Sequence, residues 1–454
     1  MLGPEALGRY YFAAALASFA TLVAGLGLPV YGAREVAKRR DDPAALERLH
    51  GELFALNLLA TFAVLAAYAG IALCLPAFAG HGRLLALLGI GVAANVFSVE
   101  YLFLGLEAFP NLAWRALATK TVSLAALFAC VRGPEHLYWF AAIGVAASSG
   151  NGLLGFLSAW RRVRLRPAFA GLRAHAAPLA VTAGNLALVC VYNNLDSVFL
   201  GMLTGTGAVS LYNAGVRFDR MVVLMISSAG IVLAPRMAFL FQSDKGEETR
   251  RLAGKSLSVM CFLACPAAAF VLAAAPELTA LVFGTEFSGA AASMRICAPI
   301  ILINGFTNFL GLQILFPRGE ERLMLFAVGA AAVVDAALIR LLAPHMAQEG
   351  AAIALLAAES TVLAVQGWAY RRRHAHTAEI GKNAWRYFLA APAAAAAVLA
   401  GRAVSGQPAL ALAAALAIGT PAYLGALFAL QDPVAKELLA RARQALGLSG
   451  NGTA

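Results

Sequence analysis

Charged residues are scarce in this 454-residue sequence. Only 13% of the residues are Asp, Glu, Lys or Arg, whereas 61% are hydrophobic and the mean hydropathy is +0.75. A soluble chain of this length would expose far too much apolar surface. Apolar runs of about 20 residues recur from end to end, and each is long enough to cross a bilayer as a helix. The short alternating segments of a transmembrane β-barrel are missing. The composition therefore predicts an all-α polytopic membrane protein.

Motifs that carry metal or covalent chemistry are also missing. The seven histidines form no H-E-x-x-H pattern, and the chain contains no G-x-x-x-x-G-K-[ST] phosphate-binding loop. The cysteines lie in or beside apolar runs without any C-x-x-C spacing, so we expect them to pack rather than to form disulfides or bind metal (Cys74, Cys130, Cys190, Cys261, Cys265 and Cys297). We therefore expect no catalytic residues, no metal and no bound cofactor.

Basic residues alternate between loops, although the net charge of +11 by itself would also suit a nucleic-acid-binding protein. Lys and Arg concentrate in loops 31–51, 161–176, 238–255, 317–322 and 371–386 and after residue 430, whereas the other loops hold only Arg83, Arg132 and Arg402. This is the pattern of membrane orientation, with the basic loops facing the cytoplasm and anionic lipid. It argues against nucleic acid as a partner. We expect thirteen spans, near 8–30, 52–76, 84–106, 112–131, 137–160, 177–201, 207–237, 256–283, 291–316, 322–344, 350–370, 384–401 and 408–430.

An internal repeat indicates that the chain begins one span late. "LGPEALGRYYFAAA" opens at Leu2 and "LGMLTGTGAVSLYNAG" opens at Leu200, and each runs from Leu-Gly through a short turn and an aromatic residue into a span. A full span precedes Leu200, whereas only Met1 precedes Leu2. Two six-span lobes and two extra spans would make fourteen. Chance similarity of two glycine-containing turns is the alternative.

Several ordered motifs resemble the bacterial polysaccharide (O-antigen) flippase family of the multidrug/oligosaccharidyl-lipid/polysaccharide (MOP) exporter superfamily. "GLGLPVYGAREVAKRRDD" (25–42) is similar to that family's first cytoplasmic loop, G-L-P-x-Y-G-x-R-E-I-A-x-x-R-D-D. "VEYLFLGLE" (99–107), "YNNLDSVFLG" (192–201) and "YNAGVRFDRM" (212–221) resemble further family segments in the same order. The charged positions of the loop motif are Arg34, Glu35, Arg40, Asp41 and Asp42. The family's first span has no counterpart here, which suggests a misplaced start codon or a truncated chain.

The resemblance implies a MATE-like fold of two pseudo-symmetric lobes. We expect an N-lobe of five spans at 1–160, a basic inter-lobe loop at 161–176, a C-lobe of six spans at 177–370, and two extra spans with a cytoplasmic tail at 371–454. The implied activity moves an undecaprenyl-pyrophosphate-linked sugar unit across the bacterial inner membrane. The implied partners are the lipid-linked oligosaccharide, membrane lipids and other polysaccharide assembly proteins, and an H+ or Na+ gradient is the implied driving force.

Charged residues inside the spans are candidate site residues, because ionised groups rarely face lipid. Arg115, Arg236, Arg295 and Arg340 lie near span ends, where long side chains can reach the headgroups. Lys120, Arg217 and Arg220 lie deeper; Lys120 is about 12 Å from the start of its span. We expect these three cations to line an aqueous cavity and attract the pyrophosphate. The acidic candidates for ion pairing or coupling are Glu100, Asp219, Asp335 and Glu359.

Asp196 lies about 8 Å from the outer end of its span. One interpretation pairs it with Arg217 or Arg220 until substrate or a coupling cation arrives; the other makes it part of a polar cluster that shapes the turn after it. Internal pairing, such as Lys120 with Glu100, also stays open for the remaining charges.

Other functions share part of this evidence. A MATE-type drug or metabolite exporter and a lipid II flippase would have the same fold and span count. A polysaccharide polymerase or ligase would need a substantial outer loop, whereas all the expected outer loops have about ten residues or fewer.

Overall fold

The computed structural model describes residues 2–166, 168–169, 171–242, 246–374 and 384–437. All regular secondary structure within these ranges is helical, which confirms the all-α prediction. Among these described residues, nine helical segments are long and apolar enough to cross a membrane. The protein is therefore a multi-pass membrane protein, while the count of thirteen spans stays a prediction. The predicted cytoplasmic tail lies mostly outside the described ranges.

The chain forms two compact units, Met1–Ser210 and Leu211–Ala454. This boundary falls one helix later than the predicted inter-lobe loop at 161–176. The predicted lobes were defined by the sequence repeat, whereas these units are defined by contacts. The predicted lobe boundaries therefore remain a prediction.

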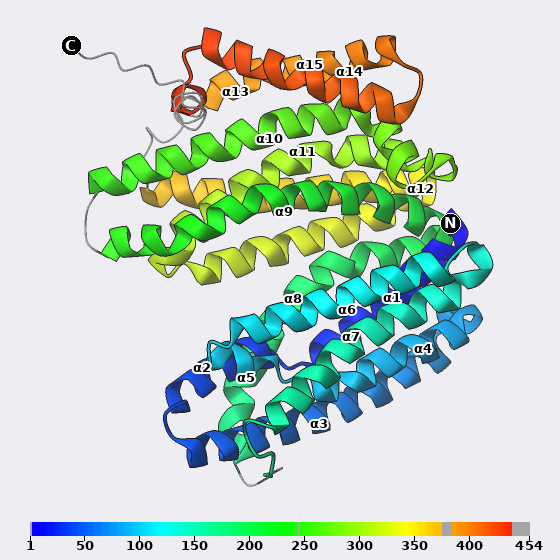
Figure 1. Cartoon of the computed structure of the whole chain (residues 1–454), viewed down its shortest axis with the longest axis vertical. Helices are drawn as coiled ribbons and strands as arrows, with labels where there is room; N and C mark the ends of the chain where they lie inside the picture. Colours follow the sequence, from blue (N-terminus) through cyan, green and yellow to red (C-terminus); the bar gives the residue numbers. More distant parts are fainter. Residues whose placement is uncertain (1, 167, 170, 243–245, 375–383, 438–454) are drawn as a thin grey trace. The chain divides into compact units, whose positions relative to one another are not determined.

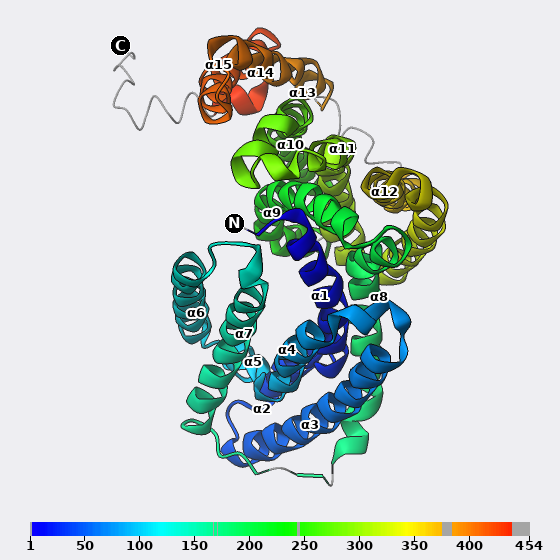
Figure 2. The same cartoon turned by 90° about the vertical axis from the view of Figure 1, so that its right-hand side faces the viewer.

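The first unit is built around its first helix. Helix α1 packs against α3, α4 and α8, whereas α6 and α7 form a pair, as Figure 2 shows. The small and aromatic side chains of α1 allow this central position, because Ala13, Ala24 and Phe12 are almost completely buried. The helices are α1 (Pro4–Ala24), α2 (Leu28–Arg39), α3 (Pro43–Cys74), α4 (Gly82–Ala93), α5 (Glu100–Gly105), α6 (Phe109–Cys130), α7 (Leu137–Trp160) and α8 (Leu172–Thr204).

Two local signals separate α1, α2 and α3. Gly27 adopts φ 70°, a left-handed conformation that glycine reaches without steric cost, and Pro29 starts α2 directly after it. The Asp42 carboxylate caps α3 by accepting hydrogen bonds from the backbone N–H groups of Ala44 and Ala45, at 3.0 and 3.1 Å. The first predicted span is therefore a membrane helix followed by a separate amphipathic helix.

The third predicted span is interrupted. Helix α4 ends at Ala93, the short 3-10 helix η2 (Ala94–Phe97) follows, and α5 starts at Glu100 after extended backbone at Ser98. The whole segment still has the length and hydropathy of one span. The prediction of one span near 84–106 therefore missed a break within it.

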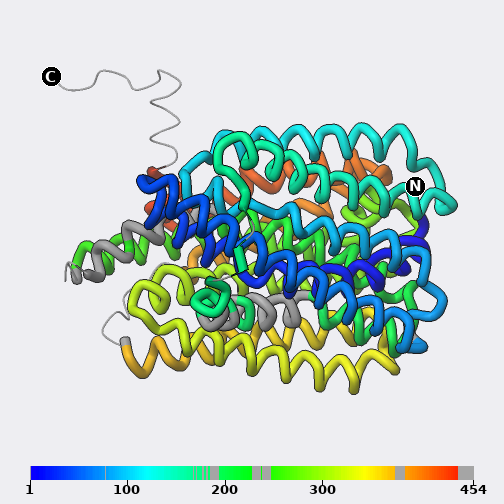
Figure 3. Tube along the Cα trace, turned by 90° about the horizontal axis from the view of Figure 1, so that it is seen from below, coloured from blue at the N-terminus to red at the C-terminus, as the bar shows by residue number. Residues whose placement is uncertain are grey.

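The second unit consists of long helices and a C-terminal hairpin. The helices are α9 (Thr206–Gln242), in which the unit boundary falls, α10 (Gly246–Val282), α11 (Ala290–Asn308), the π-helix η5 (Phe309–Leu315), α12 (Glu321–His374), α13 (Ala384–Ala390), α14 (Pro392–Val404) and α15 (Pro408–Ala429). Helices α10, α11 and α12 pack in sequence, and the α14–α15 hairpin packs on α10 (Figure 1). Within each unit most long helices run side by side, as the trace in Figure 3 shows.

Helix α12 contains two of the predicted spans. Ala347 has the non-helical angles φ 46° and ψ −123°, and Pro344 lies one turn before it. A Cβ atom on Gly350 would lie 2.7 Å from the Leu342 backbone, so the chain turns back closely on itself here. The break matches the gap between the spans predicted at 322–344 and 350–370.

Candidate functional site

Two of the family-like motifs pack against each other in the first unit. Helix α2 comes from the 25–42 motif and α5 from the 99–107 motif. A Cβ atom on Gly32 would lie 2.8 Å from the Tyr101 Cβ, and one on Gly105 would lie 2.6 Å from the Val36 Cβ. The two glycines therefore permit a helix contact that any larger residue would block. Proximity explains why both motifs are glycine-containing.

Polar side chains join the same two motifs to each other and to α3. Arg40 pairs with Glu107 at 3.2 Å, and the His50 Nδ1 atom lies 2.9 Å from the Tyr101 hydroxyl. Tyr101 and His50 are 1% exposed. These contacts gather the residues of the predicted cytoplasmic loops at one end of the unit.

The charged residues of the loop motif have separate roles. Glu35 is buried and accepts hydrogen bonds from Lys38 at 2.8 Å and Arg39 at 2.7 Å, while the exposed Arg34 lies 3.6 Å from it. Asp42 caps α3, and Asp41 is exposed. Several of the motif charges therefore stabilise the local structure of the loop.

A second buried network lies beside this loop. The Tyr31 hydroxyl is 2.7 Å from the His175 Nδ1 atom, and the His175 Nε2 atom is 3.0 Å from Glu52, which also pairs with Arg48 at 3.0 Å. His175 and Glu52 are 6% and 7% exposed. The network fastens the first turn of α8 to α2 and α3.

Close backbone packing reinforces this attachment. The backbone N–H of Ala168 donates to the Gly51 carbonyl at 3.4 Å, and a Cβ atom on Gly51 would collide with the Arg166 carbonyl. The predicted inter-lobe loop thus lies directly on α3. Sequence reasoning missed the network; its signal was a polar Glu52 inside the apolar start of a span.

The candidate site charges divide by sign. Lys120, Arg217 and Arg220 are exposed. Four carboxylates are at least partly covered: Asp219 and Asp335 are 2% and 1% exposed, and Glu100 and Glu359 are half-buried. Both Asp219 oxygens accept no hydrogen bond from any residue that the structure describes. The three cations are thus accessible to a ligand, although their common cavity stays a prediction.

Asp196 is 1% exposed near the end of α8. The predicted pairing with Arg217 or Arg220 would join residues of different units, so it stays a prediction.

Arg115, predicted to lie near a span end, packs within the first unit. Its side chain is buried, with the guanidinium 4.5 Å from the Phe103 ring centroid and Nε donating to the Asn111 carbonyl at 3.3 Å. Gly155 of α7 leaves the space that the guanidinium occupies. The pairing of Lys120 with Glu100 stays a prediction.

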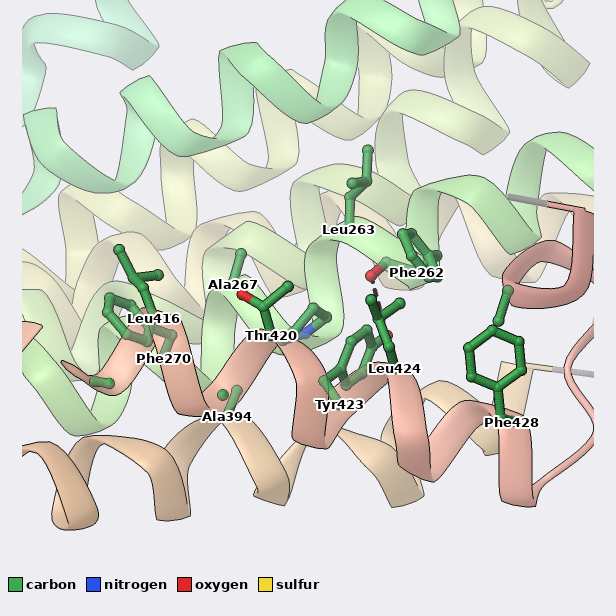
Figure 4. A pocket seen from close by; sticks show the side chains of 14 residues that line it. Phe262, Leu263, Ala267, Phe270, Ala394, Leu416, Thr420, Tyr423, Leu424 and Phe428 are labelled. Carbon is green, nitrogen blue, oxygen red and sulfur yellow. Dashed lines mark hydrogen bonds between the residues drawn. The ribbon is translucent and has the colours of Figure 1, made fainter. Parts of the chain in front are cut away.

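The second unit contains a cavity of about 580 Å3 between α10 and the α14–α15 hairpin. Figure 4 shows Phe262, Phe270 and Leu416 on its wall, with Thr420 as a polar exception. The Tyr423 hydroxyl donates to the Phe262 carbonyl at 3.0 Å and so satisfies its own polar group. The cavity is therefore suited to an apolar chain rather than to a charged headgroup.

Comparison with models of protein families identifies the family of this chain. The family model described as "Polysaccharide biosynthesis protein" matches residues 1–241. The chain belongs to this polysaccharide biosynthesis protein family. The match includes the motifs on α2 and α5 and ends within α9, so it confirms the resemblance found in the sequence. No curated protein sequence matches the chain.

Solved structures confirm the fold of this polysaccharide biosynthesis protein. A lipid II flippase, MurJ, in an inward closed conformation superimposes with a TM-score of 0.75 at 11% identity, covering 95% of this chain and 94% of the flippase. An inward-facing multidrug resistance MATE family transporter of the MOP superfamily gives a TM-score of 0.64 at 15% identity, covering 83% and 92%. The chain therefore has the MOP-superfamily transporter fold.

Proposed function

We propose that this protein is a flippase that moves undecaprenyl-pyrophosphate-linked oligosaccharide units, for O-antigen or another surface polysaccharide, across the bacterial inner membrane. The observation that carries the proposal is the polysaccharide biosynthesis family match over the motif-bearing half of a MOP-fold transporter. The lobes would alternate access to a central site, as repeated-lobe transporters do. The protein is then a transporter rather than an enzyme.

The exposed span cations support recognition of the pyrophosphate. Lys120, Arg217 and Arg220 lie on helices of a membrane protein, yet their side chains are accessible. Cations at this depth are unfavourable against acyl chains and favourable against a wet cavity and a phosphate. We therefore assign the three residues to recognition of the pyrophosphate.

The apolar cavity supports recognition of the lipid. A polyprenyl chain has no polar atoms, and burial of each CH2 group contributes about 0.8 kcal/mol. A cavity walled by Phe262, Phe270 and Leu416 suits such a chain. We assign it to the undecaprenyl tail, while the headgroup uses the cations.

Coupling requires a carboxylate that can bind a cation. Asp219 is buried without a hydrogen-bond donor among the described residues, so an H+ or Na+ ion would relieve an unfavourable carboxylate. Glu100, Asp335 and Glu359 are the other candidates. We propose Asp219 as the first to test.

Lipid II transport is the second candidate function, because the fold of a lipid II flippase matches most of the chain. Drug export has the weaker structural match. Neither fold match specifies a substrate at 11% or 15% identity, whereas the family description concerns polysaccharide. The family match therefore favours an oligosaccharide cargo.

Complementation tests the proposal. The gene should restore surface polysaccharide in a bacterial strain that lacks its own oligosaccharide flippase and accumulates the lipid-linked unit, and Arg217→Ala should not. Rescue of a strain depleted of its lipid II flippase, without rescue of polysaccharide, would instead establish the second candidate. Normal polysaccharide in cells carrying Arg217→Ala would refute the role of Arg217.

A further inference from the structure

The break between α4 and α5 is stabilised by specific side-chain hydrogen bonds. The Asn57 amide donates to the carbonyls of Asn95 and Val96 at 3.0 and 3.3 Å, and Asn95 donates back to the Asn57 side chain at 3.1 Å. Asn57 is 1% exposed. These bonds replace part of the helical ladder lost at η2. Irregular backbone at membrane depth occurs where it is covered by protein or lines a water-filled cavity.

Polar groups converge where the helix resumes. Glu100 is the first residue of α5, is half-buried, and accepts a hydrogen bond from the Asn151 amide at 3.3 Å. Asn151 lies about 13 Å from the end of α7, too deep for water at the membrane surface. The side-chain oxygen of Asn151 accepts no hydrogen bond from the residues that the structure describes. Helices α4, α5 and α7 lie together here (Figure 2).

Aromatic rings flank these polar groups. The Phe97 ring lies in the break and contacts Phe156 edge to face, with ring centroids 5.4 Å apart, and Phe156 contacts Trp160 at 5.7 Å. Phe97 and Phe156 are half-buried, so part of each ring is accessible. The site therefore combines an apolar wall with a carboxylate and an amide.

The chemistry of these groups selects among ligands. A pyrophosphate would be repelled by the Glu100 carboxylate. A sugar ring offers hydroxyl donors to a carboxylate and an amide oxygen, acceptors to an amide N–H, and apolar C–H faces to aromatic rings. A small number of placed polar groups on an apolar wall is typical of such specific sites.

We propose that Glu100 and Asn151, beside the broken span, form the subsite that recognises the sugar portion of the substrate. The inference rests on the proposed function. It assigns the pyrophosphate to the three span cations and the sugar hydroxyl groups to Glu100 and Asn151. The Phe97 ring completes the subsite.

The test compares two probes on the full-length protein in nanodiscs: bare undecaprenyl pyrophosphate and the same lipid carrying a short N-acetylhexosamine oligosaccharide. The wild type should bind the glycosylated probe about tenfold more tightly, as expected for one charge-assisted hydrogen bond. Glu100→Gln and Asn151→Leu should each remove this preference, so that the variant binds the two probes with equal affinity. Glu107→Gln is the matched control, because Glu107 pairs with exposed Arg40 outside the subsite.

Thermal melting of each variant verifies that it is folded. If the folded variants retain the wild-type preference for the glycosylated probe, the subsite is refuted while the proposed function stands. Equal wild-type affinity for the two probes refutes it as well. A wild-type protein that binds neither probe contradicts the proposed function and this inference with it.

Discussion

The predicted cytoplasmic end of the first unit and the cavity of the second unit differ in the chemistry of their side chains. The first is a set of buried polar contacts, such as Tyr31 with His175 and His50 with Tyr101. The second is an apolar space in which the Tyr423 hydroxyl is satisfied by a backbone carbonyl. Buried polar groups specify one geometry because each needs its partner, whereas an apolar wall tolerates varied chains. The comparison therefore sets a region held in one geometry by paired polar groups against a region that accepts varied apolar groups.

The largest effect should come from blocking the contact between the two motifs. Gly32→Leu would place a side chain inside Tyr101, so we expect a loss of several kcal/mol of stability and little folded protein. Gly70→Leu is the control, since nothing lies within 4 Å of its added Cβ. Size-exclusion chromatography in detergent measures both. Equal monodisperse yields would show that the motifs do not need close packing.

Removal of one partner from the buried network should have the next largest effect. His175→Leu leaves Glu52 buried opposite an apolar side chain, and we expect a loss of about 3 kcal/mol. Glu5→Gln breaks the exposed pair with Arg9 and should cost less than about 1 kcal/mol. Thermal unfolding in detergent compares the two variants. A His175→Leu protein as stable as the wild type would remove the network from the comparison.

Filling the apolar cavity should affect transport more than stability. Thr420→Phe places a ring in the cavity from an exposed position of α15, and we expect about a tenfold lower transport rate, or about 1.4 kcal/mol. Ala125→Phe adds the same ring to an exposed position of α6 and serves as the control. Flipping of a labelled lipid-linked oligosaccharide measures both. An undiminished rate in a folded Thr420→Phe protein would exclude the cavity as the tail site.

The smallest effect should come from breaking a partly exposed ion pair between α10 and α14. Arg402 of α14 pairs with Glu277 of α10 at 2.5 and 3.0 Å, and also donates to the Ala273 carbonyl at 2.8 Å. Because the pair is partly solvated, Arg402→Gln should lower stability by about 1 kcal/mol or less. Thermal unfolding in detergent should show a small shift. A loss as large as that from His175→Leu would mean that the hairpin depends on this ion pair.

The length of the apolar runs predicted the helices well because burial in lipid requires such runs. Each predicted span has a helical counterpart, and the gap near Ala347 was placed correctly. The break before Glu100 was missed because its stabilising amide, Asn57, lies on another helix.

The site was harder to predict for the same reason. The loop motif at Arg34, Glu35 and Asp42 was visible in the sequence, but the His175–Glu52 contact joins residues 123 positions apart. Arg115 was assigned from its depth alone, whereas Phe103 and the space at Gly155 determine where its guanidinium lies. Side-chain partners across helices need the tertiary structure.

Flipping in reconstituted liposomes tests the central claim most directly. Liposomes that contain the purified protein receive a fluorescent undecaprenyl-pyrophosphate-linked oligosaccharide, and an impermeant quencher reports which leaflet holds it. We predict that the wild type exposes the inner-leaflet pool to the quencher, and that Arg217→Ala does so at least about tenfold more slowly. Wild-type liposomes that protect this pool as well as protein-free liposomes do would contradict the account.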